Sequence, residues 1–429
     1  MPSFSELLTL PGPRSFLRRL VGLIDEGGRQ VVLVVPDWVT GSEPLEALEM
    51  VLPELHMDRS QRYISLQPED VASLGFVLAM ARALGVEEYS DEVALLTGEH
   101  LADTCVLVPL WAAEPAEARR VGALLESVGR ATLADPTVPR AVVVAVTDTK
   151  HLTQVPADEL YVRRHWWWRV LHRLDTQVYV WNESFRRTVD DVQREVIIEL
   201  AAWDMDTAQW LLTNWDGATV DSAVGCLRDL SYVLSDDAIS GEEVGHSFDR
   251  LAHVERTTQL GEEPTPELLE LWSRGVLLRW DGAIRPRLCA IGDGADLHES
   301  VRRAVHHGQT RALMPKLDLW RGMLEEEVRS ALSEASLSAF LDNSWNASNR
   351  NPAFHLTVTD VLEAPVLVAL IESQPSLNHL RDSPAMTLLK RLRQARNSLA
   401  HARCLDGDMV GRLLQRHREY TDWKDSITA

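Results

Sequence analysis

Five short runs of β-branched and other apolar residues recur through the first 185 residues of the chain. They cover residues 31–36, 62–66, 105–110, 141–146 and 177–181. Before and between these runs, apolar side chains recur with the period of a helix, for example at residues 13–25, 71–84 and 116–128. Parallel strands need a crossover connection and are buried on both faces, which produces continuous apolar runs of this kind. The alternation therefore predicts an α/β domain over residues 1–185, built on a parallel sheet with covered faces.

The charge balance limits the partners that the chain can have. Among its 429 residues, 64 are acidic and 43 are basic, which gives a net charge of −21. Nucleic-acid phosphates attract Lys and Arg, so we do not expect a protein this acidic to coat nucleic acid with its whole surface. A local basic patch on an acidic body remains compatible with this composition.

The cysteines and the longest apolar runs exclude two further classes. The four cysteines, Cys105, Cys226, Cys289 and Cys404, lie too far apart for a zinc ribbon or a disulfide framework, and we expect no metal and no cofactor. The longest apolar runs have the length of strands, which predicts no membrane span. The first residues carry Glu6 rather than a basic leader, so we expect a cytoplasmic protein.

Residues 186–295 have a mainly helical pattern that ends in a hairpin signal. Helices are predicted at residues 189–203 and 208–215, and a short helix at residues 265–274 precedes apolar segments on both sides of Asp281-Gly282. Apolar runs around Asp-Gly favour a tight hairpin. A helix followed by a hairpin is how a winged helix ends. We therefore predict a helical, winged-helix-like domain over residues 186–295 and a helical bundle over residues 296–429.

The segment after the first strand is where a phosphate-binding loop would lie. Such a loop needs glycines that expose backbone N–H groups, a lysine for the phosphates and a Ser or Thr for Mg²⁺. Within residues 36–43 only Gly41 and Ser42 match, no lysine is present, and Asp37 and Glu43 would repel a triphosphate. The layout resembles a P-loop NTPase of the AAA+/STAND kind that lacks its Walker motifs. An unrelated doubly wound domain is the alternative, and both interpretations predict no ATP hydrolysis.

Three consecutive tryptophans, Trp166 to Trp168, lie in a basic segment at residues 163–173. Aromatic stacking combined with arginine contacts would suit single-stranded nucleic acid. Consecutive side chains on a helix point about 100° apart, so three such rings could not form one stacking platform. We therefore favour a helix whose tryptophans fill a core between domains.

Two smaller polar groups are interpreted as surface features. Asp204 and Asp206 alternate as metal ligands do, but no histidine lies near them, so we expect solvated acids at a helix end. His306 and His307 lie in a polar helical pattern and are expected to be exposed.

The strongest functional signal is a basic helix predicted over residues 388–403. At 100° per residue its apolar stripe consists of Leu388, Leu392, Ala395, Leu399 and Ala402. Arg396 lies at the edge of this stripe, while Asn397 and His401 point away from it. Residues 381–403 contain six basic residues and one acid, which indicates a local anion-binding face.

Residues 396–401, Arg-Asn-Ser-Leu-Ala-His, resemble the R-x4-H motif of the HEPN superfamily, and residues 406–414 resemble that family's turn into its last helix. The resemblance covers the chain from about Leu317 onward. Many HEPN proteins are metal-independent ribonucleases whose active site forms where two copies of the motif meet. The resemblance implies that Arg396 stabilises phosphate charge, that Asn397 orients the reacting group and that His401 transfers protons.

The residue types suit this chemistry. A guanidinium offers a fixed fork of donors to phosphate, and an imidazole titrates near neutral pH. The spacing of five residues turns by about 140° along a straight helix, so a helix end or a second copy is needed to bring both groups to one phosphate. The candidate RNA-binding residues on the same segment are Lys390, Arg391, Arg393 and Arg403.

Three functions from different classes follow. The first is a HEPN-type endoribonuclease effector of a prokaryotic defence or toxin-like system, controlled by an inactive NTPase-like module. The second is a non-catalytic assembly or sensor component that binds partner proteins of the same system. The third, a DNA-binding regulator, is the weakest because the hairpin tip and residues 261–270 are acidic where phosphate contacts need Lys and Arg. RNA and a second copy of the chain, bound through the C-terminal bundle, are the expected partners of the first function.

Overall fold

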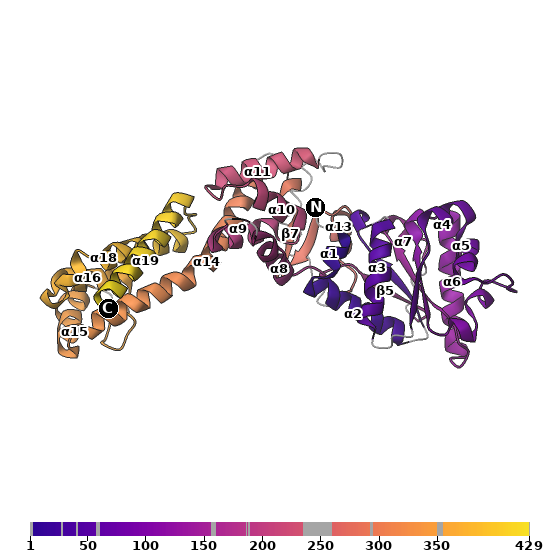
Figure 1. Ribbon diagram of the computed structural model, residues 1–429, viewed down its shortest axis with the longest axis horizontal. Coiled ribbons are helices and arrows are strands. Elements are labelled where there is room, and N and C mark those ends of the chain that lie inside the picture. Colours follow the sequence, from indigo (N-terminus) through magenta and orange to yellow (C-terminus); the bar gives the residue numbers. More distant parts are fainter. Residues whose placement is uncertain are drawn as a thin grey trace. The chain divides into compact units, whose positions relative to one another are not determined.

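The computed structural model describes residues 3–26, 29–39, 42–56, 61–155, 160–185, 187, 189–234, 260–291, 295–349 and 355–428. The chain forms two units, whose elements are labelled in Figure 1. The α/β unit comprises Met1–Asn182, Ala201–Gln209 and Asp236–Gly292, and the helical unit comprises Glu183–Leu200, Trp210–Ser235 and Asp293–Ala429. Residues 186–295 thus contribute to both units.

The α/β unit contains the parallel sheet that the sequence predicts. Its strand order is β2-β3-β4-β1-β5, and every neighbouring pair is parallel. The strands are β1 (Gln30–Val34), β2 (Arg62–Ser65), β3 (Thr104–Pro109), β4 (Val142–Thr147) and β5 (Val162–Trp166). Val31 of β1 lies opposite Val144 of β4 and Arg163 of β5. All residues of the interior strand β1 are buried, as its continuous apolar run indicates.

Helices cover both faces of this sheet (Figure 1). α2 (Pro11–Asp25) and α3 (Ser42–Leu55) lie on one face, and α6 (Pro115–Ala134) lies on the other. The other elements include α1 (Phe4–Leu8), α4 (Pro68–Leu74), α5 (Phe76–Leu84), α7 (Thr149–Leu152), α8 (Arg173–Ser184) and 3-10 turns at Asp37–Val39, Ala94–Leu96, Glu99–Leu101, Leu110–Ala112 and Leu288–Ala290. The single helix predicted at residues 71–84 is wrong, because Gly75 adopts a φ of 77° and separates α4 from α5.

The fifth strand lies elsewhere than the sequence predicts. Residues 177–181 belong to α8, and the basic segment before Trp167 forms β5 instead. The start of α8 is fixed by Asp175, which accepts the backbone N–H of His172 at 2.6 Å. The Trp280 indole donates to the Thr176 hydroxyl at 3.1 Å. These tertiary contacts override the strand propensity of the segment.

The predicted helix and hairpin near residue 280 are confirmed. α13 (Pro266–Ser273) precedes the antiparallel strands β6 (Leu277–Trp280) and β7 (Ala283–Pro286). Asp281 and Gly282 have φ angles of 48° and 80°. Two consecutive positive φ values are typical of the type I′ turn that Asp-Gly favours.

The helical unit is built from the helices that follow α8. α9 (Asp191–Ala201) and α11 (Val220–Val233) lie in it apart from the last residue of α9, and α10 (Met205–Asn214) ends in it. The C-terminal helices are α14 (Ala295–Ser330), α15 (Glu334–Phe340), α16 (Ala364–Ser373), α17 (Asn378–Arg381), α18 (Pro384–Ala400) and α19 (Gly407–Thr428), with a π-helical segment at Leu341–Asn346 and a 3-10 turn at Pro375–Leu377. Their apolar faces share one core, which includes Leu313, Leu367, Leu388 and Tyr420.

Candidate functional site

α18 carries the R-x4-H motif at its C-terminal end. Leu388, Leu392, Ala395 and Leu399 are buried in the bundle core, as the apolar stripe predicts. Arg396 is half-buried at the edge of the stripe, and Asn397 and His401 are exposed. The apolar stripe therefore positions the three motif side chains at the surface of the helical unit.

The helix ends earlier than the sequence predicts. Its last residue is Ala400, so His401 is the C-cap, and Ala402 lies outside the helix with a φ of 53° instead of joining the apolar stripe. The Arg403 N–H donates to the Ser398 carbonyl at 2.9 Å, and the Ala402 N–H donates to the Leu399 carbonyl at 3.1 Å. This pair of bonds is a Schellman motif, which normally has glycine where the chain has Ala402. His401 itself keeps the helical bond from its N–H to the Asn397 carbonyl at 3.1 Å, so the chain turns away from the helix only at Ala402.

The guanidinium of Arg396 forms an ion pair with Glu363 at the N-cap of α16. Both side chains are partly exposed, at 37% and 43%. Among the described residues no side-chain hydrogen bond or ion pair joins Arg396, Asn397 and His401 to one another, and only the His401 backbone N–H bonds to the Asn397 carbonyl, at 3.1 Å. The Glu363 carboxylate thus pairs with the guanidinium to which the resemblance assigns phosphate binding.

The four predicted RNA-binding residues have different environments. The Lys390 ammonium lies 3.6 Å from Glu372, and the Arg391 guanidinium donates to Gln394 at 2.8 Å. Arg393 and Arg403 are exposed, and neither pairs with a carboxylate among the residues that the structure describes. Arg403 follows directly on the turn after His401, whereas Arg393 lies a full helical turn before Arg396.

α14 supplies groups beside the motif that sequence reasoning missed. The Arg302 guanidinium donates to the Ala402 carbonyl at 2.8 Å, and the His306 Nε2–H donates to the Leu399 carbonyl at 2.8 Å. His306 is therefore half-buried rather than exposed as expected, while His307 is exposed. The spacing of Arg302 and His306, one helical turn apart, is the only sequence signal that could have indicated this contact.

The turn between α18 and α19 is held by Gln309 of α14. Its buried amide donates to the Leu405 carbonyl at 2.6 Å and accepts the Leu405 N–H at 2.8 Å. The Gly407 N–H donates to the Ala218 carbonyl at 2.7 Å, and a Cβ at Gly407 would lie 3.1 Å from the Ala218 Cα. These contacts fix the backbone that follows His401.

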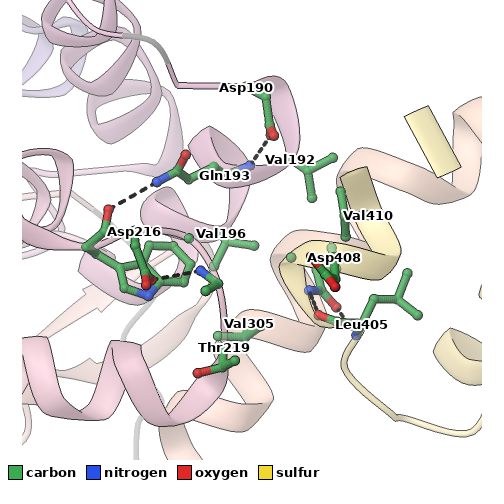
Figure 2. A pocket seen from close by; sticks show the side chains of 15 residues that line it. Asp190, Val192, Gln193, Val196, Asp216, Thr219, Val305, Leu405, Asp408 and Val410 are labelled. Carbon is green, nitrogen blue, oxygen red and sulfur yellow. Dashed lines mark hydrogen bonds between the residues drawn. The ribbon is translucent and has the colours of Figure 1, made fainter. Parts of the chain in front are cut away.

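A pocket of about 260 Å³ lies beside this turn, within the helical unit (Figure 2). Valine side chains from α9, α14 and α19 and Leu405 of the turn line it together with Asp190, Asp216 and Asp408. Asp190 accepts the Gln193 N–H and Asp216 accepts the Ala218 N–H, each at 2.8 Å. Two of the three carboxylates thus serve to shape the local backbone.

The tryptophan segment is buried, but not as the predicted helix. Trp166 ends β5, and Trp167 and Trp168 follow it in the loop before α8, with exposures of 2%, 0% and 0%. The Trp272 indole of α13 donates to the Trp167 carbonyl at 3.1 Å. These rings form part of the core of the α/β unit and have no surface on which bases could stack.

The carboxyl ends of β1 and β4 form the point where the connections of the sheet diverge, because β1 leads to β2 on one side and β4 leads to β5 on the other. Open α/β sheets bind ligands at such a point. Here α13 fills it: Ser273 donates to Asp37 at 2.7 Å and lies 2.6 Å from the Thr149 hydroxyl. Lys150 pairs with Asp37 at 2.9 Å. Gly41 lies outside the described residues.

Asp204 and Asp206 are not the solvated acids that the sequence predicts. The Arg287 guanidinium donates to both oxygens of Asp204, at 2.7 and 3.0 Å, and to Asp206 at 3.3 Å. Burial, followed by the charge of Asp204, raises the pKa of Asp206 to about 6. The group is a buried ion pair that joins the start of α10 to the end of β7.

Within the described residues no group of three or more His, Cys, Asp and Glu side chains is arranged to hold a metal ion, and no helix is long and apolar enough to cross a membrane. No model of a known protein family matches the chain, and no curated protein sequence is significantly similar to it. The functional argument therefore rests on the residues around the end of α18.

Proposed function

We propose that the helical unit is a HEPN-like, metal-independent endoribonuclease, and that the chain acts as an effector in a prokaryotic defence or toxin-like system. The observation that carries this proposal is the position of the motif. Arg396, Asn397 and His401 are at the surface of a helical bundle, and α18 ends between Arg396 and His401. His401 still makes the helical bond to the Asn397 carbonyl at 3.1 Å, so its divergence of about 140° from Arg396 remains, and we propose that a second copy of the motif completes the site.

The proposed chemistry needs only groups that this surface holds. The RNA 2′-hydroxyl attacks the adjacent phosphorus, the bond to the 5′-oxygen breaks, and a 2′,3′-cyclic phosphate forms. The His401 imidazole would accept the 2′-hydroxyl proton and give a proton to the leaving 5′-oxygen. The Arg396 guanidinium would stabilise the charge on the phosphoryl oxygens.

The α/β unit is proposed to be an inactive, NTPase-like control module. Its parallel sheet has helices on both faces, but its own α13 occupies the crevice in which a nucleotide would bind. We propose that residues 266–286 form a winged-helix-like element, because a helix there is followed by a hairpin.

RNA digestion in EDTA tests the nuclease proposal. The wild-type chain should cut RNA and leave DNA intact, because DNA lacks the attacking hydroxyl. His401→Ala should lower the rate by roughly 10²–10⁴-fold through loss of proton transfer. Arg396→Lys should also lower it, because an ammonium does not replace the bidentate fork. Cleavage that requires Mg²⁺, or that survives His401→Ala, would remove the assignment.

The second candidate is a non-catalytic assembly component. The ion pair between Arg396 and Glu363 favours it, because a guanidinium neutralised by its own chain is suited to holding α18 against α16. Under this function the wild-type chain and both variants would be equally inactive on RNA, and the bundle would bind a partner protein instead.

A further inference from the structure

The C-terminus of α18 is covered by donors from α14. The carbonyls at the end of a helix carry a partial negative charge and would repel a phosphate placed next to His401. Here the Arg302 guanidinium binds the Ala402 carbonyl and the His306 imidazole binds the Leu399 carbonyl. The cationic Arg302 therefore offsets the negative end of α18 at the position of the proposed catalytic histidine.

Arg303 extends this positive charge along α14. Glu299 accepts from Arg302 at 2.7 and 2.8 Å and from Arg303 at 2.8 Å, so two guanidinium groups share one carboxylate. Hydrogen bonds from these two arginines lower the pKa of Glu299 to about 2, which keeps it charged and leaves the trio with a net charge of +1. The Arg303 side chain is 63% exposed and can bind a ligand in solvent.

Arg403 adds an exposed guanidinium next to this contact in the chain. It follows Ala402, whose carbonyl holds Arg302, and its exposed side chain pairs with no carboxylate among the described residues. The nearest acids along the chain are already engaged. Asp406 accepts the Met409 N–H at 2.6 Å, and Asp408 lies 3.9 Å from the Arg412 guanidinium. Arg302 and Arg403 thus place positive charge at the residues that follow His401, one from α14 and one from the turn itself.

We propose that Arg303 of α14 and Arg403 of the α18–α19 turn form a second phosphate subsite, which holds the RNA phosphate next to the one cleaved at His401. This inference rests on the proposed function. Single-stranded RNA is the ligand that fits, because its flexible backbone can present successive phosphates to two exposed guanidinium groups. The subsite positions the RNA strand and takes no part in bond cleavage.

The salt dependence of binding tests the subsite directly. The full chain carrying His401→Ala, which prevents cleavage, is titrated against a labelled single-stranded RNA by fluorescence anisotropy at several salt concentrations. Removing one arginine that binds a phosphate should lower the slope of log Kobs against log salt by about 0.7 for a single strand. Arg303→Gln and Arg403→Gln should each produce this change, and the double variant should show the sum.

Arg418→Gln is the matched control. Arg418 is an exposed arginine on α19, eleven residues beyond Gly407, so the variant removes the same charge away from the motif. Arg303→Gln leaves Glu299 paired with Arg302, so the fold should be preserved, and thermal unfolding checks this. Unchanged slopes in both subsite variants, or an equal change in Arg418→Gln, would overturn the inference.

Cleavage assays separate this inference from the nuclease proposal. If the wild-type chain does not cut RNA but the two subsite variants lower the slope, the phosphate subsite stands and the nuclease proposal fails. If the wild-type chain cuts RNA through His401 and the slopes do not change, the nuclease proposal stands and the subsite fails. A chain that does not bind RNA at all overturns both.

Discussion

Glu363 determines whether the Arg396 guanidinium is available to a phosphate. An exposed ion pair of this kind contributes up to about 1 kcal/mol. Glu363→Gln removes the competing carboxylate, so RNA binding should tighten by up to about fivefold, which is the equivalent of that free energy. Anisotropy titration in the His401→Ala background measures the change.

The control for this prediction is Glu326→Gln, which neutralises an exposed glutamate on α14. If both variants tighten binding equally, the cause is the general loss of negative charge and not the release of Arg396. If Glu363→Gln has no effect, the ion pair does not compete with RNA, and the assembly function gains support.

His165 makes the α/β unit sensitive to acid. Its ring stacks on Phe16 with centroids 4.1 Å apart, and burial lowers its pKa from 6.5 to about 4. Between these values the unfolded chain binds a proton that the folded chain does not, so stability falls as the pH drops from 6.5 to 4. His165→Phe should keep the stacking and reduce this loss.

Thermal unfolding of both proteins between pH 4 and 7 measures the effect. Asp206 changes folding stability in the opposite direction as the pH falls. Its raised pKa of about 6 makes the folded state bind more protons than the unfolded state below that pH. Its contribution is present in both proteins and cancels in the comparison. Equal pH dependence in the two proteins would mean that His165 takes up its proton in the folded state.

At the scale of elements, burial decides what the sequence could predict. The interior strands β1, β3 and β4 lie within two residues of their predicted positions, because strands covered on both faces need unbroken apolar runs. The edge strand β2 was also located, from the tyrosine and isoleucine in its short run. β5 is an edge strand and contains Arg163 and Arg164, so its pattern does not indicate a strand. The contacts of Arg302 and His306 with the end of α18 join distant segments, and no local pattern encodes them.

The end of α18 was missed because alanine occupies the left-handed position. A residue with a Cβ is strained at the φ of 53° that Ala402 adopts, whereas glycine is not. Ala402→Gly should therefore stabilise the chain by about 0.5–1 kcal/mol, after the larger chain entropy of glycine in the unfolded state is subtracted. Denaturant unfolding monitored by circular dichroism measures this difference.

Gly411→Ala is the companion variant for this test. Gly411 lies within α19, and a Cβ there meets nothing within 4 Å, so alanine should also stabilise the chain, by about 0.5–1 kcal/mol through helix propensity. The two substitutions are the reverse of each other, and both are expected to stabilise. Destabilisation by Ala402→Gly would show that the Schellman turn is not populated in solution.

At the scale of the whole molecule, the α/β unit should not respond to nucleotides. Binding of ATP with Mg²⁺ at a hundred times its dissociation constant would stabilise the chain by about 2.7 kcal/mol. Because α13 holds Asp37 through Ser273 and fills the crevice, ATP should give neither turnover nor a rise in the unfolding temperature. Phosphate release and thermal shift assays test both. Turnover that Ser42→Ala abolishes would contradict this prediction.

The nuclease proposal places the active site between two copies of the chain, so activity should depend on association. Each copy would bring its own Arg396 and His401 to a shared site. A mixed pair of the His401→Ala and Arg396→Lys variants would still hold one native arginine and one native histidine, donated by different chains. Mixing the two inactive variants should therefore restore part of the RNA cleavage, with a maximum at equal amounts.

The mixing experiment needs an independent measure of association, which analytical ultracentrifugation of the mixture provides. Rescue should rise with total protein concentration over the same range in which dimers form, because the shared site exists only in the dimer. Mixing either variant with itself is the control and should add nothing. If dimers form and no activity returns, Arg396 and His401 must act within one chain.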